Sequence, residues 1–354
     1  MKIKLSFYIL TLRFTPNINK QNNYNMDAKR QALIAQVAKF GMGAKILSAE
    51  EAIEIDLGPL AALKGTWVAK PFEGWNVIAV PGPKNPHDQG FILEVIPYSE
   101  TLTFTPVVVA GNRGPFVDGV QQEQHITGLI YEQVVTSACD TELCNTMKFP
   151  AGTEIHAETG MFLNMLDFNS VVNPDDPGGI VQQFTIARLS NIPHGNAVMA
   201  LGTSLTGAPA NNDIFEPAPI RPTPTIAGES LPLGYGTQQY GKQQFPEVFN
   251  QGDPNTFLRK TLGDDVITAM TTLALSTKNG TGGILNIPYI QKNIDTTEMQ
   301  STFWIETIKN PEAGKPDIMQ LQYSQTINLV FPATGSPQLI NWPHVTVSTL
   351  RKEH

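Results

Sequence analysis

The sequence predicts an all-β protein, an up-and-down antiparallel β-barrel of about ten strands with N-terminal helices and one long Pro/Gly-rich insertion. Charged residues make up 16% of the 354-residue chain, below the roughly 25% of an ordinary soluble domain. Uncharged Asn, Gln, Thr, Ser, Gly and Pro take their place. Alternating apolar and polar runs, separated by Gly, Pro and Asn, are typical of antiparallel strands. The runs 124–137 and 153–166 are long, and long twisted strands that follow one another close most easily into a barrel.

The N-terminal region precedes the first predicted strand. Residues 1–25 begin with basic and apolar residues, as a signal peptide does. However, Arg13 interrupts the apolar run and no small-residue cleavage site follows, so we interpret them as a disordered extension. Residues 26–58 predict two helices. Apolar residues at helical spacing indicate the first over 27–40, and a Ser-x-x-Glu capping box indicates the second over 49–55.

Residues 59–354 predict one barrel domain, interrupted by an insertion at 204–254. In each strand we expect an apolar inner face and an outer face that uses Thr, Gln, Asn and Ser in place of Lys and Glu. The insertion is rich in Pro and Gly, which predicts an irregular lid or surface wrap with a short helix after Asp253-Pro254. The predicted strands span 65–70, 74–80, 89–97, 101–110, 124–137, 153–166, 181–190, 194–203, 266–276, 284–290, 298–309, 318–331 and 343–351.

The charge pattern excludes two classes of partner. The formal net charge is −8 and the 24 Lys and Arg residues form no run, whereas nucleic acids and anionic membrane surfaces require clustered cations. No stretch reaches the roughly 18–20 apolar residues of a membrane-spanning helix. We therefore expect a cytoplasmic protein that binds a small molecule and neither nucleic acid nor membrane. A surface so poor in charge also predicts a homo-oligomer, in which the insertion could wrap a partner subunit.

The chain has two cysteines, Cys139 and Cys144, in a C-x4-C pair. No second pair completes a zinc site. A disulfide that closes so short a loop is possible, but two free thiols are the favoured interpretation for a cytoplasmic protein.

Two histidines of the middle region are candidates for a site. His156 and Glu158 alternate in I-H-A-E-T-G, so their side chains point to the same face of a strand. A metal site would need further ligands that this spacing does not supply. We favour a polar pair inside or at the mouth of the barrel, hydrogen-bonded to neighbouring strands. His194 lies in the tight turn N-I-P-H-G-N, as a turn residue or at the rim of a pocket.

A third histidine, His344, begins the last predicted strand, directly after Trp342 and Pro343. Alternation places it on one face with Thr346 and Ser348. A lone histidine at the start of a strand is usually structural, but this position near the end of the barrel is also what an iron-ligating imidazole requires. The sequence has no G-x-S-x-G, H-E-x-x-H or P-loop motif, so it predicts no reaction class by itself.

Three motifs, in their order along the chain, carry a resemblance to a known family. Residues 63–67 read L-x-G-T-W, residues 155–163 read I-H-A-E-T-G-M-F-L, and the closing strand reads W-P-H-V-T-V around His344. This order resembles the nitrobindins, fatty-acid-binding-protein-like barrels of the calycin type that carry haem. The resemblance covers residues 60–202 and 264–351, but neither the N-terminal helices nor the insertion.

The resemblance implies a haem protein. His344 would be the proximal iron ligand and haem b the cofactor. Ferric haem would bind nitric oxide or process reactive nitrogen or peroxide species, in an isomerase or peroxidase-like reaction. Arg113 or Arg188 would pair with the haem propionates. The residues expected around the cofactor are His344, Trp342, Trp67, Thr66, His156, Glu158, His194 and Arg188.

A second function remains open on the same residues. Ala69 and Pro71 stand where the first strand of nitrobindins usually has glycine, and the insertion could cover the mouth of the barrel as a lid. Both features favour the alternative of a non-enzymatic carrier, which would hold a fatty acid or another apolar ligand in the same barrel.

Overall fold

A computed structural model describes residues 43–46, 55–81, 91–117, 120–146, 148–165, 184–231, 252–292, 294–333 and 336–353. The predicted extension 1–25 and the predicted helix 27–40 lie outside these residues. So does the predicted helix 49–55, except for its last residue.

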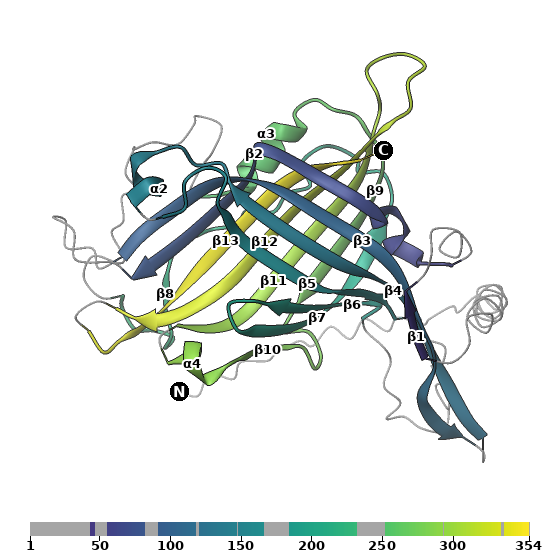
Figure 1. The fold of residues 1–354 in the computed structure, drawn as a ribbon, viewed down its shortest axis with the longest axis horizontal. Coiled ribbons are helices and arrows are strands. Elements are labelled where there is room, and N and C mark those ends of the chain that lie inside the picture. The colour runs from purple at the N-terminus through teal and green to yellow at the C-terminus, as the bar shows by residue number, and fades with distance from the viewer. Residues whose placement is uncertain are drawn as a thin grey trace, which may run out of the picture.

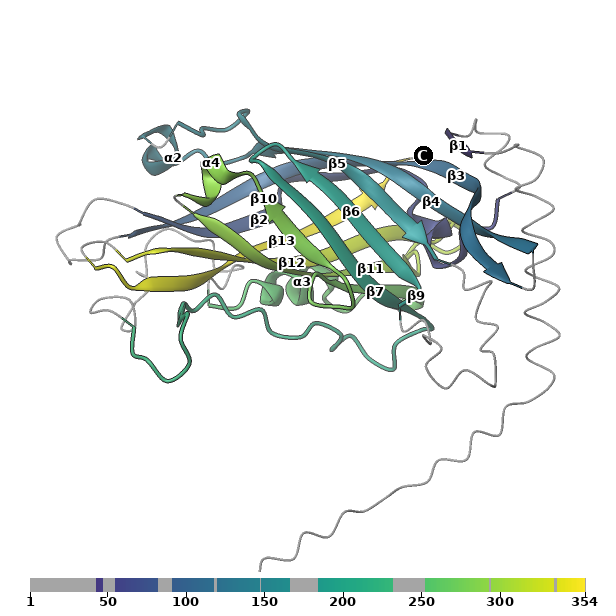
Figure 2. The same cartoon turned by 90° about the horizontal axis from the view of Figure 1, so that it is seen from below.

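Long antiparallel strands form a closed barrel (Figures 1 and 2). Each barrel strand pairs with the next barrel strand along the chain, and the last pairs with the first, so the sheet closes on itself. The all-β, up-and-down prediction is therefore confirmed. The ten barrel strands are β2 (Gly65–Pro81), β3 (Phe91–Val117), β4 (Val120–Ser137), β5 (Glu154–Asn164), β6 (Ile186–Ile192), β7 (Asn196–Thr206), β9 (Ile267–Ser276), β11 (Asp295–Ile308), β12 (Ile318–Pro332) and β13 (Leu339–Lys352).

Several strands differ from the prediction in their limits. The predicted pair 65–70 and 74–80 is one strand, β2, because a register shift between Ala69 and Gly74 bends the strand without ending its pairing. The predicted pair 89–97 and 101–110 is likewise one strand, β3. The predicted strand 284–290 is a short strand, β10 (Gly283–Asn286), followed by a helix, α4 (Pro288–Gln291), whose first position is a proline.

A strand also occurs in the region where only helices were expected. β1 (Gly43–Ile46) pairs with Val107–Ala110 of β3. The pairing of β2 with β3 stops at Gly65 and Phe104, so β3 presents an open edge beyond that point. β1 satisfies the backbone groups of this edge.

The described part of the insertion covers the barrel's own outer wall (Figure 2). β8 (Thr223–Pro224) pairs with Ile340 and Asn341 of β13. Helix α3 (Asn255–Leu262) follows Asp253-Pro254 as predicted and contacts β12 and β13. The wall beneath is apolar, so the expectation of a polar outer face is wrong here. Its buried cluster includes Trp75, Val77, Phe215, Ile220, Phe257, Leu258, Leu262, Trp304, Val345 and Val347.

One end of the barrel is closed and filled. The 3₁₀ helix η2 (Gly58–Leu63) lies across it, with Leu60 and Leu63 fully buried. Trp67 is also fully buried; its Nε1–H donates to Leu63 O at 2.7 Å, and Lys352 Nζ lies 5.1 Å from its ring. The cluster behind them fills the interior with Leu102, Phe104, Leu129, Tyr131, Phe162, Phe303, Leu321 and Leu350.

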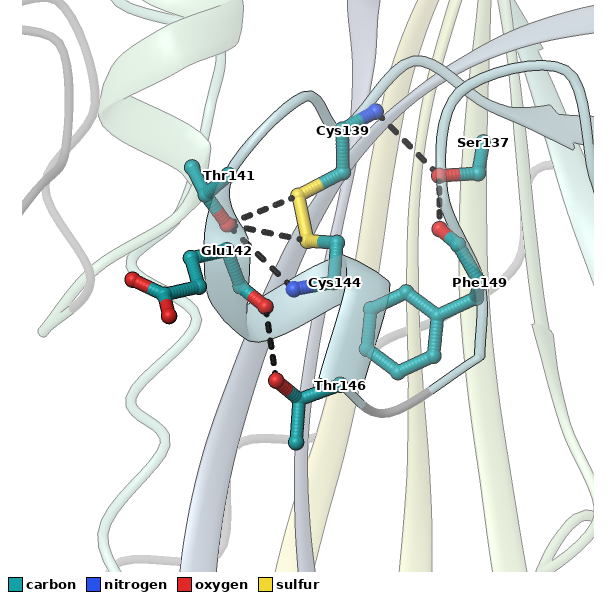
Figure 3. Close-up of a disulfide and its surroundings, with 7 residues drawn as sticks. All are labelled: Ser137, Cys139, Thr141, Glu142, Cys144, Thr146 and Phe149. Atoms are coloured by element: carbon teal, nitrogen blue, oxygen red, sulfur yellow. Dashed lines mark hydrogen bonds between the residues drawn. A yellow bond between two sulfur atoms is a disulfide. The ribbon is translucent and has the colours of Figure 1, made fainter.

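Cys139 and Cys144 form a disulfide (Figure 3), so the prediction of two free thiols is wrong. The short helix α2 (Glu142–Thr146) brings their Cα atoms to 6.1 Å, within the range that a disulfide spans. Ser137 Oγ accepts from Cys139 N–H at 3.2 Å and donates to Phe149 O at 2.8 Å, which ties the loop to the chain that follows it.

Among the residues described, no helix has the length and apolar character needed to cross a bilayer.

Candidate functional site

A cavity of about 350 Å³ lies at the end of the barrel opposite η2. Along β2, Trp67 is near η2 whereas Asn76 and Ile78 line the cavity. In β13, Leu350 likewise belongs to the filled end and His344 lines the cavity. The cavity is lined by Asn76, Ile78, Glu94, Ile96, Tyr98, Gln133, Val135, Lys148, Phe149, Thr153, Glu154, Ile155, His156, His194, Tyr323, Gln325, Ile327, His344 and Thr346. Its size lies in the range of small-molecule sites, about 300–1,000 Å³.

His344 and Thr346 enter this cavity from β13, on the face that alternation predicted. The Nε2–H of His344 donates to Asn76 Oδ1, which also accepts from Thr346 Oγ1 at 2.9 Å. Burial, and then the charges of His156 and His194, lower the pKa of His344 to about 3. At neutral pH His344 is therefore an uncharged imidazole whose other ring nitrogen, Nδ1, carries a lone pair.

His156 has a charged partner instead. Its Nε2 lies 3.3 Å from Glu158 Oε2, two residues along the same face of β5. The His156 ring reaches the cavity, whereas the Glu158 side chain is 1% exposed and lies behind it. The turn between β6 and β7 places His194 against His156, with ring centroids 5.5 Å apart. Burial, and then the His156 charge, lower the pKa of His194.

Arg188 keeps Glu158 ionised inside the barrel. Burial opposes the charge of Glu158, but Arg188 and the hydrogen bonds from His156 and Tyr131 outweigh it and hold the pKa of that carboxyl well below its usual range. The Arg188 guanidinium donates to Glu158 Oε1 at 2.8 Å, Tyr131 Oη at 3.1 Å and Gln325 Oε1 at 2.5 Å. Three ring centroids surround it, those of Tyr131 at 5.4 Å, Phe303 at 5.5 Å and Phe162 at 5.7 Å.

A second buried network forms the rest of the cavity floor. Glu100 Oε1 accepts from Gln133 Nε2 at 2.6 Å, and Glu100 Oε2 accepts from Tyr323 Oη at 3.0 Å. Tyr98 Oη lies 3.1 Å from Tyr323 Oη. Burial raises the pKa of Glu100, and the hydrogen bonds to its carboxylate offset this only in part. The sequence interpretation missed this network and Asn76. The network could have been found from polar residues two positions apart, which lie on the same strand face, such as Tyr98 and Glu100.

The structure brings together five of the eight residues expected around a cofactor. His156, His194 and His344 line one cavity, and Glu158 and Arg188 lie directly behind its floor. Arg188 is 3% exposed and engaged with Glu158, so its guanidinium does not lie at the mouth, where we expected it to pair with propionates. The side chain of Arg113 is not among those described.

The other three expected residues lie elsewhere. Trp67 belongs to the filled end. Thr66 Oγ1 lies 3.2 Å from Thr103 Oγ1 of β3 and does not line the cavity. Trp342 is buried against Phe331, with stacked rings 6.3 Å apart, in a separate apolar cluster. Among the described residues, no three of the His, Cys, Asp and Glu side chains are grouped so that they could hold a metal ion by themselves.

Comparisons with known proteins assign no family. No family model matches the chain, and no curated protein matches it. Among solved structures, the crystal structure of Rv2717c from M. tuberculosis is similar over 84% of this chain and 100% of that chain, with 15% sequence identity and a TM-score of 0.33. A match at this level adds nothing to the barrel fold that the strand pairing already establishes.

Proposed function

We propose that this protein binds ferric haem b in the open-end cavity, with His344 as the iron ligand, in the manner of a nitrobindin-like barrel. The observation that carries the proposal is the state of His344. It is a neutral imidazole in the cavity wall, and its Nε2–H is held by Asn76 Oδ1. A metal-ligating histidine usually donates its second ring N–H to such an oxygen, which fixes the tautomer and leaves the other nitrogen for the metal.

The other cavity residues fit this group by their chemistry. Ile78, Ile96, Val135 and Ile327 offer apolar surface to a macrocycle and exclude water from it. Lys148 is exposed in the lining and would pair with propionate carboxylates in the place expected of Arg188. Bound haem would supply nitric oxide binding, or chemistry on reactive nitrogen or peroxide species.

Reconstitution with hemin tests the proposal. We expect the wild-type protein to take up hemin with a Soret band that His344→Ala loses or shifts. The matched control is His194→Ala, which removes another imidazole of the same cavity and should keep the band. A Soret band of unchanged position and intensity in His344→Ala would overturn the assignment of the ligand.

The alternative is a carrier of a small apolar ligand, and the apolar side chains of the lining favour it. The filled interior beyond the floor limits such a ligand to a short chain, since the void next to Arg188 measures only about 10 Å³. Native mass spectrometry of gently purified protein separates the two functions. A bound lipid mass without haem would favour the carrier.

A cytoplasmic location and a homo-oligomer stay part of the proposal. Because cytoplasmic thiols are kept reduced, the location part of the proposal requires that the Cys139–Cys144 disulfide form only after the protein leaves that compartment. Trapping free thiols in freshly lysed cells tests this point, because a cytoplasmic pool should contain Cys139 and Cys144 largely reduced. Light scattering on purified protein measures the oligomeric state.

A further inference from the structure

The open-end cavity holds two histidines whose partners differ in charge. Nε2 of His344 faces the uncharged amide oxygen of Asn76. Nε2 of His156 faces Glu158, a carboxylate. When two titratable groups of one site have different hydrogen-bond partners, they are suited to different tasks. A neutral imidazole suits ligation, whereas an imidazole backed by a carboxylate suits proton transfer.

Glu158 is built to remain a carboxylate in this place. Its Oε1 accepts from Arg188 and from Tyr131 Oη, which leaves Oε2 for His156. Arg188 is fixed in turn by Gln325 and by the surrounding rings. Because a carboxylate only accepts hydrogen bonds, Nε2 of His156 must carry the proton. Its Nδ1 therefore presents a lone pair.

We propose that His156 donates and accepts protons for the ligand of the open-end cavity, and that Glu158 is the residue that positions it. A ligand with an acidic X–H group loses its proton to Nδ1 of His156. The X–H bond breaks, the electron pair stays on X, and Nε2–H stays with Glu158, whose charge stabilises the imidazolium. The reverse step returns the proton. This inference rests on the proposed function in that a ligand must occupy the cavity.

Several titratable groups surround His156, and its hydrogen-bond partner is one of them. Glu158 makes the hydrogen bond with it, and His194 makes a ring contact. The charged and titratable groups that face it or share its cavity are Glu154 and Glu158 of β5, Lys148 ahead of β5, Glu94 and Glu100 of β3, His194 of the β6–β7 turn and His344 of β13. Arg188 lies behind Glu158.

The first experiment measures the tautomer of His156 by NMR on ligand-free protein labelled with ¹⁵N-histidine. We expect the Nε2–H tautomer in the wild type and a mixture of tautomers in Glu158→Gln. The matched control His194→Gln should leave the tautomer unchanged. If Glu158→Gln does not fold because Arg188 is left unpaired, the double variant E158Q/R188Q removes both charges. The Nδ1–H tautomer in the wild type, or an unchanged tautomer in both Glu158 variants, would overturn the positioning role.

The second experiment measures how fast hydrogen cyanide binds to hemin-loaded protein. The reagent is a neutral acid near pH 7 and binds ferric iron as its anion, so a proton must leave it. We expect the association rate to fall about 100-fold in His156→Gln, the low end of what a positioned acid–base group contributes. The rate should fall less in Glu158→Gln, and it should stay at the wild-type value in Thr66→Val, which alters a residue outside the cavity. A wild-type rate in His156→Gln would overturn the proton-transfer role.

A failure of the haem proposal is visible separately. If the wild-type protein takes up no hemin, the haem assignment fails while the NMR result still decides the role of Glu158. The proton-transfer comparison is then made with 4-nitrophenol, whose anion absorbs visible light. More of the bound phenol should be anionic in the wild type than in His156→Gln, and equal fractions would overturn the inference.

Discussion

The two ends of this barrel use the same strands for opposite purposes. At the closed end, inward positions carry large apolar side chains, Trp67 of β2 and Leu350 of β13 among them, and η2 covers them. At the open end the same strands turn Asn76 and His344 inward around a cavity. In β13 the same alternation runs from one end to the other, whereas in β2 the register shift between Ala69 and Gly74 moves the inward positions by one residue. In both strands the polarity of the inward residues changes along the strand. Stability and binding are thereby assigned to different ends of each strand.

Removing the largest buried side chain of the closed end should cost the most. We expect Trp67→Ala to lower the free energy of unfolding by about 3–5 kcal/mol, since it removes a fully buried ring and leaves a cavity. Urea denaturation measures this loss. Hemin affinity of the folded variant should stay at the wild-type value, and a large loss of affinity would show that the ends are coupled.

Glu158, which lies between the filled end and the cavity, should make the free energy of unfolding depend on pH in the acid range. The folded-state pKa of Glu158 lies below its unfolded value, so the unfolded chain binds the proton first as the pH falls. The stabilisation is complete above the unfolded pKa of about 4.3 and is lost below it, on the order of 2 kcal/mol. The double variant E158Q/R188Q should lack this part of the acid dependence in urea titrations between pH 6 and 3. Identical pH profiles would remove Glu158 as its source.

The disulfide should affect the open end in both stability and binding. Cys139→Ser with Cys144→Ser should cost about 2 kcal/mol, the entropy of closing so short a loop. Phe149 and Ile155 pack against the cluster formed by Ile96 and the two cysteines, and they also line the cavity. We therefore expect hemin affinity to fall as well, in contrast to Trp67→Ala. Calorimetry and hemin titration, each repeated on the wild type with a reductant, measure the two effects.

The smallest effects are expected from a threonine-to-valine substitution, made separately at each end of the barrel. Thr346→Val removes the hydrogen bond to Asn76 Oδ1 and should cost about 1 kcal/mol. It should also weaken hemin binding, because Asn76 then holds His344 less firmly. Thr66→Val removes the contact with Thr103 at the closed end and should cost only a few tenths of a kcal/mol. Equal effects on hemin affinity would contradict the division between the ends.

Periodicity explains which parts of the fold could be predicted. The alternation of apolar and polar residues located the barrel strands and placed His344 on one face with Thr346. The helix after Pro254 followed from that proline. His156 and Glu158 were expected to bond to neighbouring strands. Tyr131 and Arg188 make such hydrogen bonds to Glu158, whereas His156 bonds to Glu158 on its own strand. Each of these features depends on residues close together in the chain.

Other features depend on contacts that no local pattern contains. Trp67 and Trp342 were expected beside His344, but a motif order does not tell which end of a strand faces a cavity. The polar outer face failed near Val345, because the insertion covers that wall with apolar side chains. The disulfide depended on how α2 folds between Cys139 and Cys144.

The sequence by itself determined the all-β barrel and the strand faces, because side chains alternate with a period of two wherever a strand forms. Only the tertiary structure decided that Asn76 fixes His344, since 268 residues separate them and closure of β13 against β2 brings them together. The tertiary structure also decided that Arg188 pairs with Glu158 inside the barrel and does not lie at the mouth. A buried charge must find its partner inside the barrel, and the available partner depends on the neighbouring strands.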